Sequence, residues 1–438
     1  MTRMKESGID WIGQIPEEWE VRPIKNIVET PVTDGPHETP MLYETGIPFL
    51  SAEAVKDGIL DFNYKRGYIS LRDHERFKKK VSPKKDDIFI VKSGATTGNV
   101  GIVNTDEIFD IWSPLALVRS KNTLAIQKYI YFYLLSTLFK AQVEFNWSFG
   151  TQQNIGMGVI ERIKVILPPI SEQERIVEIL DKKTAQLDKA KALLEEQIQK
   201  LKDYRASLIY ETVTKGLDKT VPMKDSGINW IGEVPEGWGV KRLKYLVNKI
   251  GSGKTPLGGS EIFEETGILF IRSQNVHNGL IQLEDKSTYI NRNIHRQMIG
   301  TSVEKNDILL NITGASIGRV AKYDLDVEAN VNQHVCIIRC DRFVLPDYLM
   351  YFIMSEFGQF MIKIHQISGN REGLSFDNIG NFKIIIPDLD YQYKISQYLN
   401  KKMLIINQMI KTKDQQIENI NKQRQTLIYD YVTGKRRV

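Results

Sequence analysis

The sequence contains little cysteine. Only two of its 438 residues are cysteines, Cys336 and Cys340. Two such cysteines cannot staple a chain of this length, and no cluster of histidine and cysteine nearby completes a zinc site. We therefore expect two free thiols in or near a strand, without a disulfide framework or a metal.

Long apolar runs are also missing. The longest, residues 129–139, is about half of a membrane span and is interrupted by Ser136 and Thr137. The first ten residues, MTRMKESGID, lack the apolar region of a secretory signal. These absences predict a cytoplasmic protein that does not associate with a membrane.

An excess of charge of one sign is missing too. The chain has 59 basic and 54 acidic residues, a net charge of +5. Binding to a polyanion is permitted, but the basic surface must come from local clusters such as residues 76–80, RFKKK.

What the sequence does contain is an internal repeat. SGIDWIGQIPEEWEVRPIK, from Ser7, returns as SGINWIGEVPEGWGVKRLK, from Ser226, with 11 of 19 positions identical at an offset of 219. DDIFIVKSGATTGNVG and NDILLNITGASIGRVA, later in each half, are related by an offset of 220. A shared period over most of the chain indicates a duplication.

Each half has the pattern of a mixed α/β domain. Short β-rich runs such as IPFL and LALVR alternate with turn residues, and helical patterns occupy 129–142 and 348–361. The tryptophans at 11, 19, 230 and 238 recur at the same repeat positions. Because identical positions in the two halves indicate a shared scaffold, we expect these tryptophans to pack in the core or against a partner.

Each half ends in a long heptad pattern that contains no proline or glycine. We expect the seam of a helix pair to contain Leu180, Leu187, Leu194, Leu201, Leu208, Leu399, Ile406, Ile420 and Leu427. The expected companion positions are Lys183, Ala190, Gln197 and Tyr204, with Ile198 beside them, and Met409 and Ile417 in the second half. Lys413 also falls in the seam, where we expect its ammonium to reach outward to water.

Chain geometry predicts that the two helices pack antiparallel. A helix of about 45 residues is about 67 Å long, whereas the nine residues 216–224 that follow it reach about 32 Å. Parallel packing would require this linker to run back along the whole helix. Antiparallel packing places the two globular domains at opposite ends of the helices, related by an approximate two-fold axis, which suits two half-sites on one duplex.

The expected fold is therefore α+β: two repeated mixed α/β domains separated by two long helices that form a pseudo-two-fold symmetric antiparallel coiled coil. The expected boundaries are residues 1–170 for the first α/β domain, 171–216 for the first long helix, 217–388 for the second α/β domain and 389–434 for the second long helix.

Three motifs carry a resemblance to a known family. They are the W-I-G-x-x-P-E-x-W opening of each half, the LPPISEQERI lead-in at 167–176, and TAQL at 184–187. Together with the duplicated order of domains, they resemble the specificity subunit of type I restriction–modification enzymes over essentially the whole chain. The second copy departs from the lead-in: PDLDYQYKI keeps Gln392 but lacks the second proline and the glutamate pair.

The resemblance implies a non-catalytic subunit whose two α/β domains are target recognition domains that read a bipartite, asymmetric site on double-stranded DNA. It implies two methyltransferase (modification) subunits and restriction/translocase subunits as partners, with S-adenosylmethionine, ATP and magnesium on those partners and no cofactor here. In agreement, the sequence has no Asn-Pro-Pro-Tyr-like adenine methylation motif, no glycine-rich methyl-donor loop after a strand, and no nuclease pattern of paired carboxylates and lysine.

Polar loops at matching places in the two halves are the candidate DNA contacts, because amide, guanidinium and hydroxyl groups read base edges. In the first half they are His37, Thr39, Lys92, Ser93, Thr96, Thr97, Gln152, Gln153 and Asn154. In the second half they are Lys254, Thr255, Arg272, Gln274, Asn275, Thr313, Ser316, Arg319, Asn332, Gln333, His334 and Arg371. Positions that differ between the halves, such as Thr97/Ile317, Asn99/Arg319 and Ser113/Gln333, are expected to carry the choice of bases.

Two other functions are compatible with parts of the sequence. A bivalent adaptor that binds only proteins would use the same duplicated loops, and its binding would not depend on DNA. A phosphate-loop NTPase is suggested by GSGKT at 251–255, but the motif requires a glycine five residues before Gly253, where Asn248 stands.

Overall fold

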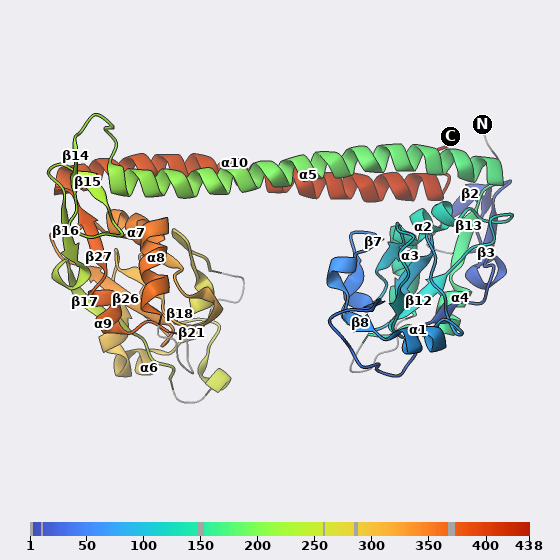
Figure 1. Ribbon diagram of the computed structural model, residues 1–438, viewed down its shortest axis with the longest axis horizontal. Coiled ribbons are helices and arrows are strands. Elements are labelled where there is room, and N and C mark those ends of the chain that lie inside the picture. Colours follow the sequence, from blue (N-terminus) through green and yellow to red (C-terminus); the bar gives the residue numbers. More distant parts are fainter. Residues whose placement is uncertain (1–2, 10–11, 147–152, 257–258, 284–287, 367–372) are drawn as a thin grey trace. The chain divides into compact units, whose positions relative to one another are not determined.

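The computed structural model describes residues 3–9, 12–146, 153–256, 259–283, 288–366 and 373–438. The chain divides into two compact units (Figure 1). The first unit contains residues 1–194 and 414–438, and the second contains residues 195–413. Each unit thus holds one globular domain and about half of each long helix.

The first unit is built on short strands. Its largest sheet has the order β4-β12-β9-β10-β7-β6, and a second sheet has the order β11-β5-β8. Hairpin β1–β2 and pair β13–β3 complete the strands. The strands are β1 (Met4–Glu6), β2 (Gln14–Pro16), β3 (Glu20–Pro23), β4 (Thr33–Asp34), β5 (Ile47–Leu50), β6 (Val55–Lys56), β7 (Ile59–Leu60), β8 (Gly67–Ile69), β9 (Ile88–Val91), β10 (Val100–Ile102), β11 (Asp110–Ile111), β12 (Leu115–Val118) and β13 (Lys164–Leu167).

Helices cover these sheets. They are α1 (Leu71–Phe77), α2 (Gln127–Leu135), α3 (Thr137–Phe145) and α4 (Met157–Arg162), with 3-10 turns η1 (Ile24–Asn26), η2 (Ala52–Ala54) and η3 (Phe62–Tyr64). The helical pattern expected at 129–142 falls on two helices, because Ser136 has extended backbone angles between α2 and α3. One core joins α2 and α3 to the long helices, and a smaller core lies around Leu50, Phe89 and Ile111.

The second unit repeats this plan. Its sheets have the orders β17-β26-β23-β24 and β21-β18-β25-β22, with pairs β19–β20, β16–β27 and β14–β15. The strands are β14 (Met223–Asp225), β15 (Glu233–Pro235), β16 (Gly239–Arg242), β17 (Val247–Ser252), β18 (Ile268–Ile271), β19 (Val276–His277), β20 (Leu280–Ile281), β21 (Tyr289–Ile290), β22 (Ser302–Val303), β23 (Ile308–Asn311), β24 (Val320–Lys322), β25 (Ala329–Val331), β26 (Val335–Cys340) and β27 (Lys383–Ile386). The shorter helices are α6 (Arg292–Gln297), α7 (Pro346–Met354), α8 (Glu356–His365) and α9 (Phe376–Gly380), with 3-10 turns η4 (Leu243–Tyr245), η5 (Gly259–Ile262), η6 (Ser273–Asn275), η7 (Ile299–Thr301) and η8 (Gly314–Ser316).

Two long helices belong to both units. They are α5 (Ile170–Lys215) and α10 (Leu389–Val432), and each begins directly after a proline-containing segment. Each helix is followed by a glycine with positive φ, Gly216 at 75° and Gly434 at 74°, a conformation that terminates helices. A side chain at Gly434 would also collide with Pro16, so glycine is required there for close packing.

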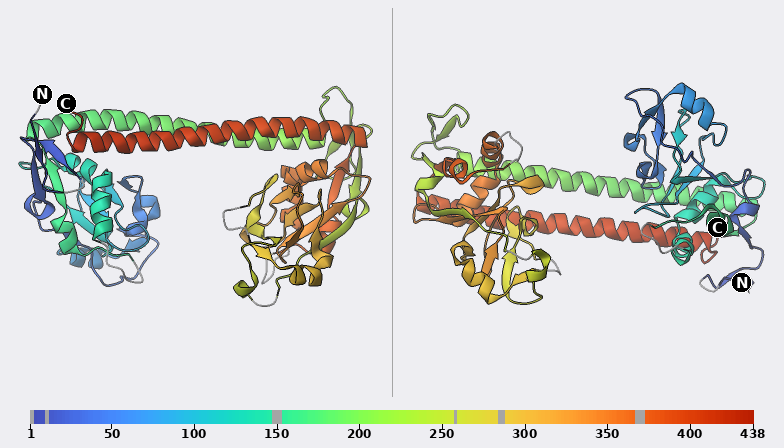
Figure 2. Two further views of the ribbon diagram at one scale, coloured as in Figure 1. Left: turned by 180° about the vertical axis from the view of Figure 1, so that it is seen from behind. Right: turned by 90° about the horizontal axis from the view of Figure 1, so that it is seen from below.

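The two long helices pack antiparallel within each unit, as predicted (Figure 2). In the first unit the Arg424 guanidinium lies 3.3 Å from the Asp188 carboxylate. In the second unit Arg205 donates a hydrogen bond to the side chain of Asn407 at 3.2 Å. The repeat maps Asp188 onto Asn407 and Arg205 onto Arg424, so the same contact occurs once in each unit.

The seam between the helices differs in part from the prediction. Leu180 and Leu399 are fully buried, and the other predicted seam leucines of α5 are half-buried. The companion positions, however, are Thr184, Lys191, Ile198, Arg205 and Thr212, one residue later than predicted. Lys183, Gln197 and Tyr204 are exposed, and so is Met409, whose neighbour Ile410 is half-buried instead.

The expectation for Lys413 agrees with the structure. Its side chain is half-buried, and its ammonium donates a hydrogen bond to the amide oxygen of Gln197, which is exposed. The aliphatic part of Lys413 thus covers the seam while its charge reaches the surface.

A set of buried polar contacts recurs in both units. Gln173 accepts a hydrogen bond from Ile126 N–H and donates to Pro168 O, which fixes the start of α5 against α2. Gln392 makes the same two contacts with Leu345 and Pro387. These glutamines explain why the otherwise divergent lead-in keeps this residue.

Both cysteines lie in β26 as free thiols. Burial raises the pKa of Cys336 and of Cys340 to about 12. Both thiols are therefore protonated at neutral pH, and neither is a reactive thiolate.

One buried contact differs between the units. In the first unit His74 Nδ1 lies 2.6 Å from the carboxylate of Asp110, which is fully buried. In the second unit His295 Nδ1 makes the corresponding contact with the side-chain amide oxygen of Asn330. The same strand position, in β11 and β25, thus holds an acid in one unit and its amide in the other.

Replacing Asp110→Asn should change how the stability of the first unit depends on pH. Burial, opposed by the hydrogen bond with His74, raises the pKa of the Asp110 carboxyl. A carboxyl whose pKa is raised by folding stabilises the fold below its unfolded pKa and loses this contribution as pH rises through the folded pKa. Relative to wild type, the melting temperature of the variant should therefore rise as pH increases from about 4, the pKa of an unfolded aspartate, toward neutral pH. If plots of melting temperature against pH ran parallel for the two proteins over this range, the interpretation would be contradicted.

Candidate nucleic-acid interface

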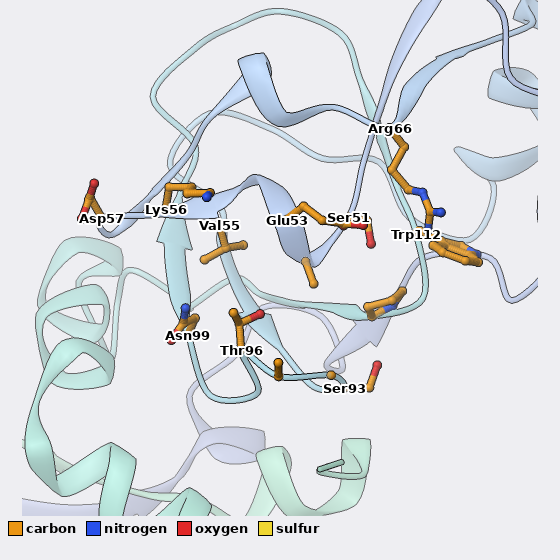
Figure 3. Close-up of a pocket in the computed structure, with 14 residues that line it drawn as sticks. Ser51, Glu53, Val55, Lys56, Asp57, Arg66, Ser93, Thr96, Asn99 and Trp112 are labelled. Atoms are coloured by element: carbon orange, nitrogen blue, oxygen red, sulfur yellow. The ribbon is translucent and has the colours of Figure 1, made fainter. Parts of the chain in front are cut away.

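The first unit has a concave surface where two strand ends meet a loop (Figure 3). One wall is the segment 51–57, which follows β5, and the facing wall is the loop between β9 and β10. The cavity has a volume of about 760 Å³. It is lined by Ser51, Ala52, Glu53, Val55, Lys56, Asp57, Arg66, Ser93, Gly94, Ala95, Thr96, Asn99, Trp112 and Pro114. We call it the first concave surface.

An arginine and a tryptophan lie together at one end of this surface (Figure 3). The Arg66 guanidinium lies 4.2 Å from the centroid of the Trp112 ring, a cation–π contact. Among the described residues, no hydrogen bond or ion pair is found for the Arg66 guanidinium or for the Trp112 indole N–H. The Trp112 N–H is buried, whereas the exposed Arg66 guanidinium presents planar donors to an external acceptor.

Two further polar side chains on this surface are exposed. Glu53 is the central residue of η2, and Asn99 closes the loop after β9. Within the described part of the chain, neither side chain has a hydrogen-bond partner or an ion pair. Their functional groups are therefore available to a ligand.

Backbone hydrogen bonds identify the corresponding positions in the second unit. Val91 N–H donates to Asn99 O at 2.8 Å, and Asn311 N–H donates to Arg319 O at 2.8 Å. Arg319 therefore stands where the first unit has Asn99.

The facing wall corresponds in the same way. Ala54 N–H donates to Ser51 O, and Asn275 N–H donates to Arg272 O, each closing a 3-10 turn. The central residues of these turns are Glu53 and Gln274.

The strand behind the surface completes the correspondence. Trp112 N–H donates to Leu50 O at 2.8 Å, and Asn332 N–H donates to Ile271 O at 3.1 Å. On the basis of this correspondence with the first concave surface, we call the region of Arg272, Gln274, Arg319 and Asn332 the second concave surface.

The structure brings several predicted residues of the second half together. Thr255 donates a hydrogen bond to Gln333, and the Gln333 amide lies 2.9 Å from His334 Nε2. His334 Nδ1 in turn contacts the Thr313 hydroxyl. These four side chains form a continuous polar row beside the second concave surface.

Other predicted contacts hold the loops in shape. Thr97 is buried and donates to Gly94 O and Gln153 O. Asn275 is buried and its amide oxygen accepts from Arg272 N–H, and the Asn332 side chain accepts from His334 N–H. The polar groups of Thr97 and Asn275, and the amide oxygen of Asn332, are thus satisfied within the fold.

The Lys92 ammonium is neutralised inside the first unit. It lies 2.6 Å from the carboxylate of Asp34, which also binds Lys80 at 2.5 Å. These two ammonium groups lower the pKa of Asp34 against the effect of burial, which is the largest influence on this carboxyl. His37 and Thr39 are exposed, and His37 lies 3.1 Å from the same carboxylate.

The remaining predicted residues fall into two groups. Gln152 and Arg371 lie outside the described residues. Ser93, Thr96, Gln153, Asn154 and Lys254 lie in loops, and Ser316 ends η8; all six are exposed or half-buried. Ser93 and Thr96 belong to the first concave surface.

The tryptophans of the repeat serve packing where they are described. Trp19 is fully buried and its indole N–H donates to Glu172 at 2.9 Å. Trp238 is buried edge-on against Tyr391, and Trp230 stacks on Phe357 with ring centroids 4.7 Å apart. Trp11 lies outside the described residues.

The GSGKT segment does not form a phosphate loop. Residues 247–252 are strand β17, and Gly253 packs so closely on β25 that an added Cβ would lie 1.6 Å from Val331 O. A phosphate loop instead follows a strand and leads into a helix N-terminus. Gly35 makes the corresponding close approach in the first unit, to Ile111 O.

Sequence analysis missed part of the first concave surface. Ser51, Glu53, Lys56, Arg66 and Trp112 were not among the predicted contacts, although Arg272 and Gln274 were. Aligning IPFLSAEAVKDG with ILFIRSQNVHNG would have transferred the prediction from the second half to the first. The alignment of the two halves gave no indication of Arg66.

The comparisons with known proteins show the family of this chain. A family model described as the type I restriction modification DNA specificity domain matches residues 16–202 and again residues 235–419. The chain therefore belongs to this family and carries two copies of its domain.

Relatives with similar sequences are named specificity subunits of type I restriction enzymes. The putative type I restriction enzyme MjaX specificity subunit of Methanocaldococcus jannaschii is 26% identical over 98% of this chain and 96% of the relative. The EcoBI specificity subunit of Escherichia coli is 25% identical over 70% of this chain and 65% of the relative. A solved chain from work on complex assembly and conformational transition of the type I R-M system has a TM-score of 0.68 at 13% identity, covering 96% of this chain and 99% of that one.

This chain is a specificity subunit of a type I restriction–modification system. It recognises DNA and assembles with partner subunits, to which the catalytic activities of such systems belong. The alternative of a protein adaptor without a DNA role is not supported. Within the described residues, no group of three or more potential metal ligands is found, and no helix has the length and apolarity needed to cross a bilayer.

Proposed function

We propose that each unit reads one half of a bipartite, asymmetric site on double-stranded DNA. The observation that carries this proposal is that the two units share their scaffold but not their concave surfaces. The ion pair of Arg119 with Asp87 and that of Arg339 with Asp307 have matching geometry. Glu53 and Asn99, in contrast, are replaced by Gln274 and Arg319.

The same scaffold with different surface groups is suited to two different half-sites. Base edges in the major groove are distinguished by the pattern of donors and acceptors presented to them. We propose that the loops containing the predicted DNA contacts supply these groups and the phosphate contacts around them. The domain limits 1–170 and 217–388 remain our proposed limits for the two reading domains.

We further propose that the chain directs two methyltransferase subunits and the restriction/translocase subunits to this site. S-adenosylmethionine, ATP and magnesium would be bound by those partners. We also propose a cytoplasmic location for this chain, as the sequence predicts.

Methylome sequencing tests this proposal. Cells that express the chain with its cognate methyltransferase subunit should acquire one methylated motif consisting of two half-sites and a non-specific spacer. Cells that express the methyltransferase subunit alone are the control and should lack the motif. Methylation without any sequence motif, or of a single uninterrupted site, would overturn the proposal.

A further inference from the structure

The two concave surfaces contain a small number of polar side chains that combine three properties. They are exposed, they occupy positions fixed by the same backbone hydrogen bonds in both units, and they differ in chemistry between the units. Glu53 with Gln274, and Asn99 with Arg319, meet all three conditions. Side chains that hold the loops, such as Thr97 and Asn275, are buried and so do not meet the first condition.

We propose that Glu53 and Asn99 in the first unit, and Gln274 and Arg319 in the second, are paired specificity positions that each contact a base edge. This inference rests on the proposed function, since it assigns residues within the DNA-reading surface. It goes further by naming the base chemistry expected at each position.

The chemistry of the four side chains assigns a preferred base to each. A guanidinium forms a bidentate pair with O6 and N7 of guanine, and a carboxylate accepts from N4 of cytosine. The amides of asparagine and glutamine pair with N6 and N7 of adenine. Arg319 should therefore select guanine, Glu53 cytosine, and Asn99 and Gln274 adenine.

The lack of internal partners supports this assignment. In the described part of the chain, none of the four side chains forms a hydrogen bond or an ion pair, so contact with a base would not first break an internal contact. By comparison, the Lys92 ammonium would have to leave the Asp34 carboxylate, 2.6 Å away. A lost internal ion pair would offset part of the binding energy.

Backbone strain does not restrict substitution at these positions. Among the described residues, the non-glycine residues with positive φ are Asp57, Asp86 and Asn306, so neither Glu53 nor Asn99 is in a left-handed conformation. Side chains of different size already occupy the equivalent positions in the second unit. The substitutions Asn99→Arg and Glu53→Gln should therefore leave the fold intact.

The test exchanges residues between the units. The chain, assembled with its methyltransferase subunits, is measured against a panel of duplexes in which each base pair of the wild-type site is varied in turn. For Asn99→Arg we expect the preference at one base pair of the first half-site to move toward guanine by at least about fivefold. Preferences at the other positions, including the whole second half-site, should stay as in wild type.

Glu144→Gln is the matched control. Glu144 is exposed on α3, outside the first concave surface, and Glu53→Gln removes the same charge from within it. Only Glu53→Gln should change the preference at a cytosine-containing position. Thermal unfolding of all variants should match wild type, which separates a change in reading from a loss of folded protein.

The outcomes separate this inference from the proposed function. If the wild-type complex distinguishes half-sites but Asn99→Arg and Glu53→Gln leave every preference unchanged, the inference is overturned and the proposed function stands. A uniform loss of affinity for all duplexes would also overturn the inference, because it would indicate a phosphate contact. If the wild-type complex shows no base preference at all, the proposed function itself fails.

Discussion

Duplex binding by the assembled complex should weaken about a thousandfold or more when salt rises from about 50 to about 200 mM. Neutralising about six phosphates releases the counterions that produce this dependence. The net charge of only +5 does not supply it, so the contribution of this chain must come from local cations such as Lys56, Arg66 and Lys254, which are exposed. Fluorescence anisotropy at several salt concentrations, plotted as log affinity against log salt, measures the slope.

Lys254→Gln tests whether one exposed lysine of the chain contributes to the salt dependence of duplex binding. Lys254 is exposed, and no hydrogen bond or ion pair is found for it in the described part of the structure. If it contacts a phosphate, the variant should reduce the salt slope by about one and leave the base preferences unchanged. A wild-type slope near zero would contradict the expected role of phosphate contacts.

The helices and the duplication could be predicted because their signals are local or repeated. The run without proline or glycine before Gly216 is a direct property of the sequence. The short linker at 216–224 then excludes parallel packing by distance alone. Neither argument requires knowledge of side-chain contacts.

The companion positions of the seam could not be fixed in the same way. Leucines at every seventh position leave a choice, since the second row can lie three or four residues after each leucine. Ile198, four residues after Leu194, indicated the correct choice, but Ala190 and Tyr204 favoured the other. The polar residues Thr184, Lys191 and Arg205 carry no hydrophobic signal, although their side chains are at least partly buried at the seam.

The sequence was enough to predict which loops form the candidate site. It was not enough to predict which side chains in those loops are free to contact DNA. Pairing of β11 with β5 brings Trp112 to the end of the strand that precedes Ser51, a contact between distant parts of the sequence. Equally, nothing near Lys92 in the sequence shows that Asp34 neutralises it. Whether a polar loop residue faces solvent or closes its own turn depends on the folded backbone.

Replacing Asp87→Ala should lower the free energy of unfolding of the first unit by about 3 kcal/mol. Asp87 is buried, accepts two hydrogen bonds from Arg119 at 2.7 and 2.6 Å, and accepts a third from Lys84 N–H at 2.7 Å. Its loss leaves the Arg119 guanidinium without its partner, and we take the low end of the expected range because this side chain is 20% exposed. The melting temperature of the first unit should fall by about 6–12 °C in calorimetry.

The second unit supplies the matched variant, because Asp307 holds Arg339 with hydrogen bonds of 2.8 and 2.8 Å. Asp307→Ala should destabilise the second unit by a similar amount. The unfolding transition of the first unit should stay at its wild-type temperature. In the double variant Asp87→Ala with Arg119→Met the two effects should not add, since the unpaired charge is removed. Simple addition would show that the two side chains are not energetically coupled.

The same ion-pair variants also test the division between scaffold and reading surface. A contact that is identical in both units cannot encode the difference between two half-sites. Complexes of Asp87→Ala that remain folded at low temperature should therefore methylate the wild-type motif, with both half-sites unchanged. A changed base preference in this variant would mean that the scaffold itself takes part in reading, and the assignment of specificity to the concave surfaces would have to be abandoned.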